Sequence, residues 1–146
     1  MNYQDLHYLL LLGFNRSNKA IVSKTSLEGL MPGQPKILEF LLEHDGCTQK
    51  EIGNGCVLDK STVTSLLSRM ILLEQIVKVP CSQDRRVTRI YLTQKGRALA
   101  KRVESICSSV NKAAWQGITQ EDRCHFIQTF QNILENLKEL ETEDEK

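Results

Sequence analysis

The sequence lacks the features of a membrane-embedded or exported protein. No apolar run approaches the ~18 to 20 residues that a membrane-spanning helix needs. The longest apolar cluster, residues 8–12, is too short and too poorly flanked to form a signal peptide. We therefore expect a cytoplasmic protein that has no membrane partner.

Sequence motifs for catalysis are missing as well. The chain contains no phosphate-binding glycine loop, no carboxylates clustered with a histidine, and no nucleophile motif with a plausible base. We therefore expect neither an enzymatic activity nor a cofactor.

The cysteines and histidines do not indicate a metal site or a disulfide framework. The five cysteines are odd in number and dispersed, none lies in a Cys-x-x-Cys pair, and the three histidines lie far apart. Because metal ligands must be closely grouped, we expect reduced thiols and no metal site. Redox sensing by Cys81 or Cys56 is an alternative that requires a lowered thiol pKa.

The charge of the chain is unevenly distributed. Its 146 residues are 40% hydrophobic and 25% charged, which is ordinary for one soluble domain that buries its own core. The formal net charge is only +1, yet residues 47–102 hold eleven basic and four acidic residues and so carry +7. Lys and Arg displace the counterions condensed on phosphates, so this region suits double-stranded nucleic acid.

Helical periodicity predicts two helices in the first third of the chain. Apolar residues at helical spacing indicate a long amphipathic helix over residues 3–26, which Gly29 and Pro32 then interrupt. A second helix tolerates Pro35 in its first turn and ends at the Asp45-Gly46 turn.

Two capping signals mark the starts of two further helices. Thr48-Gln49-Lys50-Glu51 has the form of a capping box, and Asp59 can cap a helix that begins near Lys60. We expect one side of this helix in the core: Val63, Leu66, Leu67 and Met70. The opposite side presents small hydroxyls with one leucine and one arginine: Ser61, Ser65, Ser68 and Leu72, flanked by Thr62, Thr64 and Arg69. Such a face suits a DNA major groove, and a solvated helix face is the alternative.

A hairpin with a basic tip follows. Residues 76–79 and 87–92 are β-branched and mostly alternating, and a basic loop joins them. Arg85 or Arg86 at the tip could enter the narrow minor groove of DNA, with Asp84 orienting a neighbouring guanidinium. A solubilising loop is the alternative.

Long amphipathic helices stand on both sides of this region. Thr93 can cap one helix, and a final helix begins near Gln120. One apolar face can pack on the core and another on a second copy of the chain, which would place two recognition helices ~34 Å apart on a palindrome. We expect homodimer contacts from seven residues of the terminal helices: Leu6, Leu9, Leu10, Phe126, Phe130, Ile133 and Leu137. An intramolecular bundle is the alternative.

These motifs resemble the multiple-antibiotic-resistance regulator (MarR) family of bacterial winged-helix transcription factors over nearly the whole chain. Leu30-Met31-Pro32-Gly33-Gln34 resembles the start of the family's second helix, residues 48–52 that of the third, and residues 58–64 that of the recognition helix. Most specific is Asp84-Arg85-Arg86, followed after five residues by Leu92-Thr93-Gln94-Lys95-Gly96, which is similar to the wing motif of the family.

The resemblance implies a mainly α-helical fold with a small β-hairpin wing, built as a single domain over residues 1–146. Residues 34–96 would form the winged helix-turn-helix core, and residues 1–30 and 97–146 the dimerisation helices. The resemblance also implies a homodimer that represses or activates genes at a palindromic operator and is often released by a small ligand between its dimerisation and DNA-binding parts. The residues expected at the DNA are Thr48, Gln49, Lys50, Lys60, Ser61, Thr62, Thr64, Ser65, Ser68, Arg69, Asp84, Arg85, Arg86 and Arg89.

Some positions depart from the family pattern. Glu74 stands in the place of a C-cap glycine, Met31 in that of a capping threonine, and Cys81 in that of a common acidic residue. Residues 71–73 are apolar where charged residues are common, and we favour core packing over the wall of a ligand pocket for them.

Three interpretations of function therefore compete. The leading one is a sequence-specific DNA-binding regulator, with repression as the favoured mode. The others are a winged-helix module that binds only protein, and a thiol redox-sensing regulator. A module that binds only protein would have no need to combine small hydroxyls, an Arg-tipped hairpin and a net charge of +7.

Overall fold

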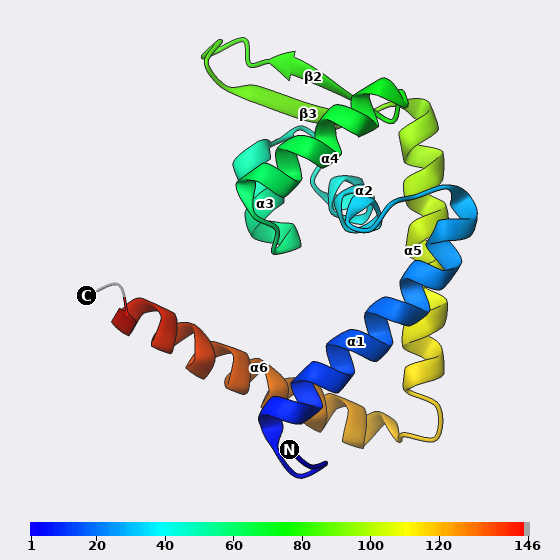
Figure 1. Ribbon diagram of the computed structural model, residues 1–146, viewed down its shortest axis with the longest axis vertical. Coiled ribbons are helices and arrows are strands. Elements are labelled where there is room, and N and C mark those ends of the chain that lie inside the picture. Colours follow the sequence, from blue (N-terminus) through cyan, green and yellow to red (C-terminus); the bar gives the residue numbers. More distant parts are fainter. Residues whose placement is uncertain (145–146) are drawn as a thin grey trace. The chain divides into compact units, whose positions relative to one another are not determined.

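The computed structural model describes residues 1–144 (Figure 1). The chain divides into two compact units, Met1–Val110 and Asn111–Lys146, and each is described by itself. Within the described residues, the helices do not combine the length and the apolarity that a bilayer span requires.

The first unit begins with α1 (Leu6–Thr25), which continues into the single 3₁₀ turn η1 (Ser26–Glu28). The predicted helix over residues 3–26 is confirmed apart from its first residues. Gly29 then adopts a left-handed conformation with φ of 77°, which ends the helical segment and favours glycine. Thr25 is the single buried residue within α1, so the apolar side chains of this helix remain at least partly exposed.

α2 (Gln34–Glu43) supplies much of the core of this unit. Pro35 lies in its first turn, where the missing N–H would have had no helical partner. The helix buries its apolar face through Ile37, Leu38 and Leu41, which are fully inaccessible to solvent. It ends at His44, as predicted from the Asp45-Gly46 turn.

α3 (Gln49–Cys56) and α4 (Lys60–Leu72) form the helix-turn-helix. The predicted core stripe of α4 is confirmed, because Val63, Leu66, Leu67 and Met70 are all buried. Val57, in the turn between the helices, has a left-handed backbone with φ of 55°. A β-branched residue rarely adopts that conformation, so this turn stores strain.

A three-stranded antiparallel sheet carries the hairpin, which extends away from the helices in Figure 1. β2 (Ile76–Pro80) pairs with β3 (Thr88–Leu92) in a register that sets Ile76 opposite Leu92. This confirms the predicted hairpin. The third strand, β1 (Cys47–Thr48), pairs with β3 on its other edge. The sequence does not predict β1, because two residues are too few to show any periodicity.

α5 (Gln94–Ala114) starts at Thr93, whose Oγ1 accepts a hydrogen bond from the Gly96 N–H at 3.0 Å, so the predicted cap is confirmed. Leu99, Ala100 and Val103 are buried against the helix-turn-helix and the sheet in one continuous core. The salt bridge from Arg102 Nε to Glu28 Oε2, 3.1 Å long, joins α5 to η1.

The second unit holds the end of α5, a turn at Gly117 and α6 (Gln120–Asp144). Its aromatic rings pack on one another: the Trp115 and Phe126 centroids lie 6.0 Å apart in a T-shaped pair, and Phe126 stacks on Phe130 at 5.6 Å. The final helix is confirmed from its predicted start at Gln120. Between Gln120 and Thr142, the structure shows no buried residue.

Candidate nucleic-acid interface

The two helices of the helix-turn-helix begin at side-chain caps that fix their direction. The predicted capping box is confirmed: Thr48 Oγ1 accepts from the Glu51 N–H at 3.2 Å, and the Thr48 N–H donates to Glu51 Oε2 at 3.4 Å. Asp59 caps α4 by accepting from the Thr62 N–H at 2.8 Å. That bond, with those from the Ser61 and Thr62 hydroxyls, lowers the pKa of Asp59 to about 2.

Most hydroxyls of α4 donate to groups of the protein itself. The Ser61 and Thr62 hydroxyls donate to the Asp59 carboxylate at 2.7 and 2.8 Å. Thr64 Oγ1 donates to the Lys60 carbonyl, and Ser68 Oγ donates to the Thr64 carbonyl, each at 2.9 Å. These protons are engaged within the helix and its cap in this structure.

Ser65 differs from its neighbours. It is exposed, and within residues 1–144 its hydroxyl makes no hydrogen bond to the protein. Arg69 lies one turn further along the same face, is also exposed, and takes part in no ion pair of the described chain. Ser65 and Arg69 therefore form a hydroxyl and guanidinium pair that is available to an external acceptor.

Gln49 connects α3 to α4. Its Nε2 donates to Thr64 Oγ1 at 2.6 Å, so this predicted DNA-contacting side chain also holds the two helices together. Lys50 and Lys60 are exposed close to it, and both line a pocket of about 380 Å³ between α3 and α4. The rim of this groove is therefore cationic.

The hairpin loop carries one guanidinium that is paired with a carboxylate and one that is not. Arg86 donates to the Asp84 carboxylate through Nε at 3.2 Å and Nη2 at 3.3 Å, and this contact lowers the pKa of Asp84. The orienting role predicted for Asp84 is thus visible in the structure. Arg85 is exposed and makes no ion pair in the part of the chain described.

Arg89 is turned toward the protein. Its Nη1 donates to the Gly46 carbonyl at 3.0 Å and so ties β3 to the turn before β1. Cys81 lies beside it, and the nearby backbone N–H groups of Gln83 and Asp84, together with the Arg89 guanidinium, favour the thiolate and lower the pKa of the Cys81 thiol. The buried thiols of Cys47, Cys56 and Cys107 differ, because burial raises their pKa values to about 11.

The apolar end of α4 contradicts one expectation. The sequence favours core packing for residues 71–73, yet Leu72 is 84% exposed and Ile71 37% exposed. The helix turns these two positions outward, because the buried stripe ends at Met70, and for Leu72 this confirms the outward face predicted from helical spacing. Leu72 extends the face that carries Ser65 and Arg69.

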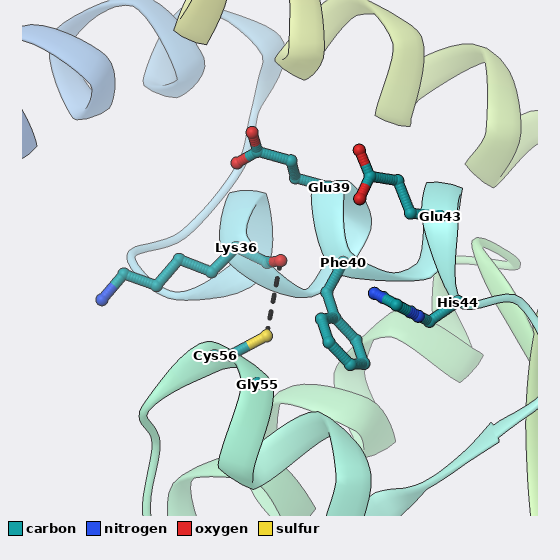
Figure 2. Close-up of a pocket in the computed structure, with 7 residues that line it drawn as sticks. All are labelled: Lys36, Glu39, Phe40, Glu43, His44, Gly55 and Cys56. Carbon is teal, nitrogen blue, oxygen red and sulfur yellow. Dashed lines mark hydrogen bonds between the residues drawn. The ribbon is translucent and has the colours of Figure 1, made fainter. Parts of the chain in front are cut away.

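A second pocket, of about 300 Å³, lies between α2 and α3 (Figure 2). The Cys56 Sγ donates to the Lys36 carbonyl at 3.4 Å, and the Phe40 and His44 rings lie 4.5 Å apart between centroids. Phe40 rests on Gly55, where a Cβ would lie 2.1 Å from the ring. No group of three or more His, Cys, Asp or Glu side chains within residues 1–144 is arranged to hold a metal ion.

The structure brings together most of the predicted DNA-contacting residues on α3, α4 and the hairpin. Sequence reasoning missed two features of this surface. One is the Gln49 to Thr64 bond, which depends on how two helices pack. The other is a contact of Thr93 and Lys95 with the residues that follow α4. The sequence shows the motif over residues 92–96, which resembles that of the family, but it does not show that these residues contact the end of α4.

The described geometry matches known proteins. Residues 28–87 match the sequence model of the MarR family. The HTH-type transcriptional regulator TtmR of Methylorubrum extorquens is 30% identical over 73% of this chain and 50% of its own length. The chain spans about half the length of the curated relatives it matches.

Solved structures share the fold. A MarR-family transcriptional regulator from Silicibacter pomeroyi is 26% identical, with a TM-score of 0.79 over 88% of this chain and 87% of that one. The MepR-DNA complex of S. aureus is 22% identical, with a TM-score of 0.84 over 94% of this chain and 99% of that one, which shows a common fold. The predicted resemblance to the MarR family and the winged-helix fold class are thereby confirmed, and residues 28–87 are the part of this chain that matches the family model.

Proposed function

We propose that this protein is a cytoplasmic, non-enzymatic repressor that binds double-stranded DNA sequence-specifically, as a homodimer on a palindromic operator. The observation that carries the proposal is the outward face of α4. Ser65 and Arg69 are exposed there with no partner in the described chain, and the same helix begins at Lys60, which lines a pocket together with Lys50. A similar fold is bound to DNA in the MepR complex, which supports the same type of partner here.

The roles of the site residues follow from their bonding. Arg69 can offer a bidentate fork to guanine, and Ser65 can donate to or accept from a base edge. Arg85 and Arg86 would lie at the minor groove, where the negative potential is strongest. Lys50 and Lys60, with Thr48 at the helix start, would contact phosphates. Ser61, Thr62, Thr64, Ser68 and Gln49 would set the position of α4 rather than distinguish bases.

The homodimer is inferred from apolar side chains that remain about half exposed in the chain described. Leu6 and Leu9 on α1 are each 45% exposed, and Phe126 on α6 is 53% exposed. Exposed apolar side chains at helical spacing favour burial against a further apolar surface. A second copy of the chain would supply that surface and would double the number of recognition helices.

Release by a small-molecule effector is also part of the proposal. The pocket of about 300 Å³ in Figure 2 falls at the lower end of the range of small-ligand sites. Lys36, Glu39 and Glu43 give its lining charge, and the Phe40 and His44 rings, tilted by 32° to each other, add an aromatic part to it. A ligand there would contact α2 and α3 directly and would act on the helix-turn-helix through them.

Selection of bound duplexes from a random pool tests the proposed function directly. We expect a recovered palindrome whose half-sites are separated by about one helical turn. The affinity should fall steeply with salt, with log K sloping by about −0.9 per phosphate contacted. A monomer in sedimentation that retains no duplex even in dilute buffer would refute the proposal.

Thiol redox sensing is a second candidate, which the lowered pKa of Cys81 favours. A thiolate attacks hydrogen peroxide, gaining one oxygen atom as sulfenic acid and releasing hydroxide. We expect peroxide to weaken DNA binding of the wild type and to leave Cys81→Ser unaffected. If both proteins respond equally, or neither responds, Cys81 is not a sensor.

A further inference from the structure

The carboxyl end of α4 is fastened to the first turn of α5 by side chains of α5 and its cap. Lys95 Nζ donates to the Leu73 carbonyl at 2.9 Å. Thr93 Oγ1 donates to the Glu74 carbonyl at 2.6 Å, and the Thr93 N–H donates to the Gln75 carbonyl at 3.1 Å. The three consecutive carbonyls of residues 73–75, which follow α4, thus all accept hydrogen bonds from Thr93 and Lys95.

The Thr93 hydroxyl serves two helices at once. It accepts from the Gly96 N–H at 3.0 Å as the cap of α5, while it donates to Glu74 at the end of α4. A hydroxyl has one proton and two lone pairs, so it can fulfil both functions. Valine has the same shape and can fulfil neither, whereas serine can fulfil both.

Gly96 permits this close approach. A Cβ at this position would lie 1.9 Å from the Gln75 carbonyl oxygen, so only glycine fits against the backbone. Glu74 completes the junction with a left-handed backbone, φ of 58°. The Glu74 N–H donates to the Ile71 carbonyl and the Gln75 N–H to the Met70 carbonyl, each at 2.9 Å, which is the Schellman pattern.

A non-glycine residue holds a left-handed conformation only where its surroundings impose it. Thr93 and Lys95 supply such surroundings for Glu74. Lys95 donates to the carbonyl of Leu73, which precedes Glu74, and Thr93 donates to the carbonyl of Glu74 itself. The direction in which α4 ends is therefore fixed by α5 as well as by the packing of its own apolar stripe. Lys95 counts among the basic residues of the region with net charge +7, but its ammonium is directed to a helix end.

We propose that Thr93 and Lys95 are positioning residues for base recognition, which hold α4 at the angle at which Ser65 and Arg69 meet the bases. This inference rests on the proposed DNA-binding function. It assigns Lys95 to the orientation of the recognition helix and not to a phosphate contact. Loss of either side chain then affects sequence discrimination, while general affinity for DNA is retained.

The test compares two duplexes of equal length: one selected by the wild-type protein from a random pool, and a scrambled version of it. The full-length variants are Lys95→Met, which keeps the aliphatic stem, and Thr93→Val, which keeps the shape. The conservative variants Lys95→Arg and Thr93→Ser retain the donors. Lys101→Met is the matched control, since Lys101 is exposed on α5 and makes no side-chain hydrogen bond or ion pair in residues 1–144.

We expect Lys95→Met and Thr93→Val to weaken binding of the selected duplex about tenfold, which corresponds to one well-formed base contact. Their affinity for the scrambled duplex and their salt slope should match the wild type, and Lys95→Arg and Thr93→Ser should restore discrimination. Lys101→Met should keep the wild-type ratio of the two affinities. Lys95 is exposed, so Lys95→Met carries the test even if Thr93→Val fails to fold.

Two results would overturn the inference. Equal weakening on both duplexes, with a salt slope shallower by about 0.9, would make Lys95 a phosphate contact. Unchanged discrimination in Lys95→Met would remove the positioning role. Both results can be distinguished from a refutation of the proposed DNA-binding function, in which case the wild-type protein would select no duplex.

Discussion

The side-chain amide of Gln49 donates to the hydroxyl of Thr64 across 2.6 Å, and so joins the first helix of the helix-turn-helix to the second. Thr64 Oγ1 simultaneously donates to the Lys60 carbonyl. Two residues that would both be assigned to DNA from their types thus engage each other. We therefore assign Gln49 and Thr64 to the orientation of α4, whereas Ser65 and Arg69 remain available to contact bases.

Base preference should depend on Ser65 and Arg69 and not on Ser68. We expect Arg69→Ala to weaken binding of the selected duplex by about 1 to 3 kcal/mol and to relax the preference at one base pair. Ser65→Ala should alter the preference at a neighbouring pair. Ser68→Ala is the control, because its hydroxyl already donates to the Thr64 carbonyl. Selection from random duplexes checks this, and the same motif for all three variants would contradict it.

The hairpin should contribute affinity without sequence preference. We expect Arg86→Ala, and to a lesser degree Arg85→Ala, to weaken binding to every duplex and to reduce the salt slope by about 0.9 for each phosphate that is no longer neutralised. Asp84→Asn should have a smaller effect, because it releases Arg86 without removing its charge. Binding titrations at several salt concentrations measure these effects. Unchanged slopes for both Arg variants would exclude the hairpin from DNA binding.

Dimerisation should depend on the exposed apolar face of α1. Leu9→Asp places a charge on a surface that we propose to be buried between two copies, so it should shift the protein to monomers in sedimentation and lower affinity for the palindrome. Val77→Asp is a matched control for the oligomeric state, since Val77 is 45% exposed, like Leu9, and lies in β2, outside the proposed dimerisation segments. A Leu9→Asp protein that remains dimeric would exclude this face of α1 from the interface, and a monomeric wild-type protein would favour the intramolecular bundle.

Two glycines should respond in opposite ways to alanine. Gly96→Ala forces a Cβ against the Gln75 carbonyl and should lower the free energy of unfolding by about 1 to 3 kcal/mol. Gly13→Ala meets nothing within 4 Å in the described structure and should raise it by roughly 0.5 to 1 kcal/mol, because alanine favours a helix interior. Urea titrations of both variants test the close approach of α5 to the end of α4, and equal effects would disprove it.

Acid should destabilise the helix-turn-helix partly through Asp59. Its pKa is about 2 in the folded protein and about 3.9 in an unfolded chain. A lowered folded pKa stabilises the folded state above about pH 4, and this contribution disappears as the pH falls from about 4 to about 2. Asp59→Asn keeps a capping oxygen but does not titrate, so its unfolding midpoint should vary less across that window. Parallel pH dependences for both proteins would contradict the assignment.

The sequence alone determined the local structure because its signals are local. A helix cap needs only a side chain and the amides two or three residues further on, so Thr48 and Asp59 marked two helix starts correctly. The stripe from Val63 to Met70 predicted which side of α4 is buried, since helical spacing alone fixes the face. The Asp-Arg-Arg loop likewise predicted the contact between the Asp84 carboxylate and a neighbouring guanidinium, which is that of Arg86.

The tertiary structure decided which of the exposed polar groups remain free. The Gln49 bond to Thr64, the turn of Arg89 toward Gly46, and the contacts of Thr93 and Lys95 with the end of α4 join residues 15 to 43 positions apart. Such bonds depend on the angles at which helices and strands pack, and the spacing of apolar residues in the sequence does not reveal those angles. The strand β1 has the same origin, because a partner distant in the chain decides whether so short a segment pairs.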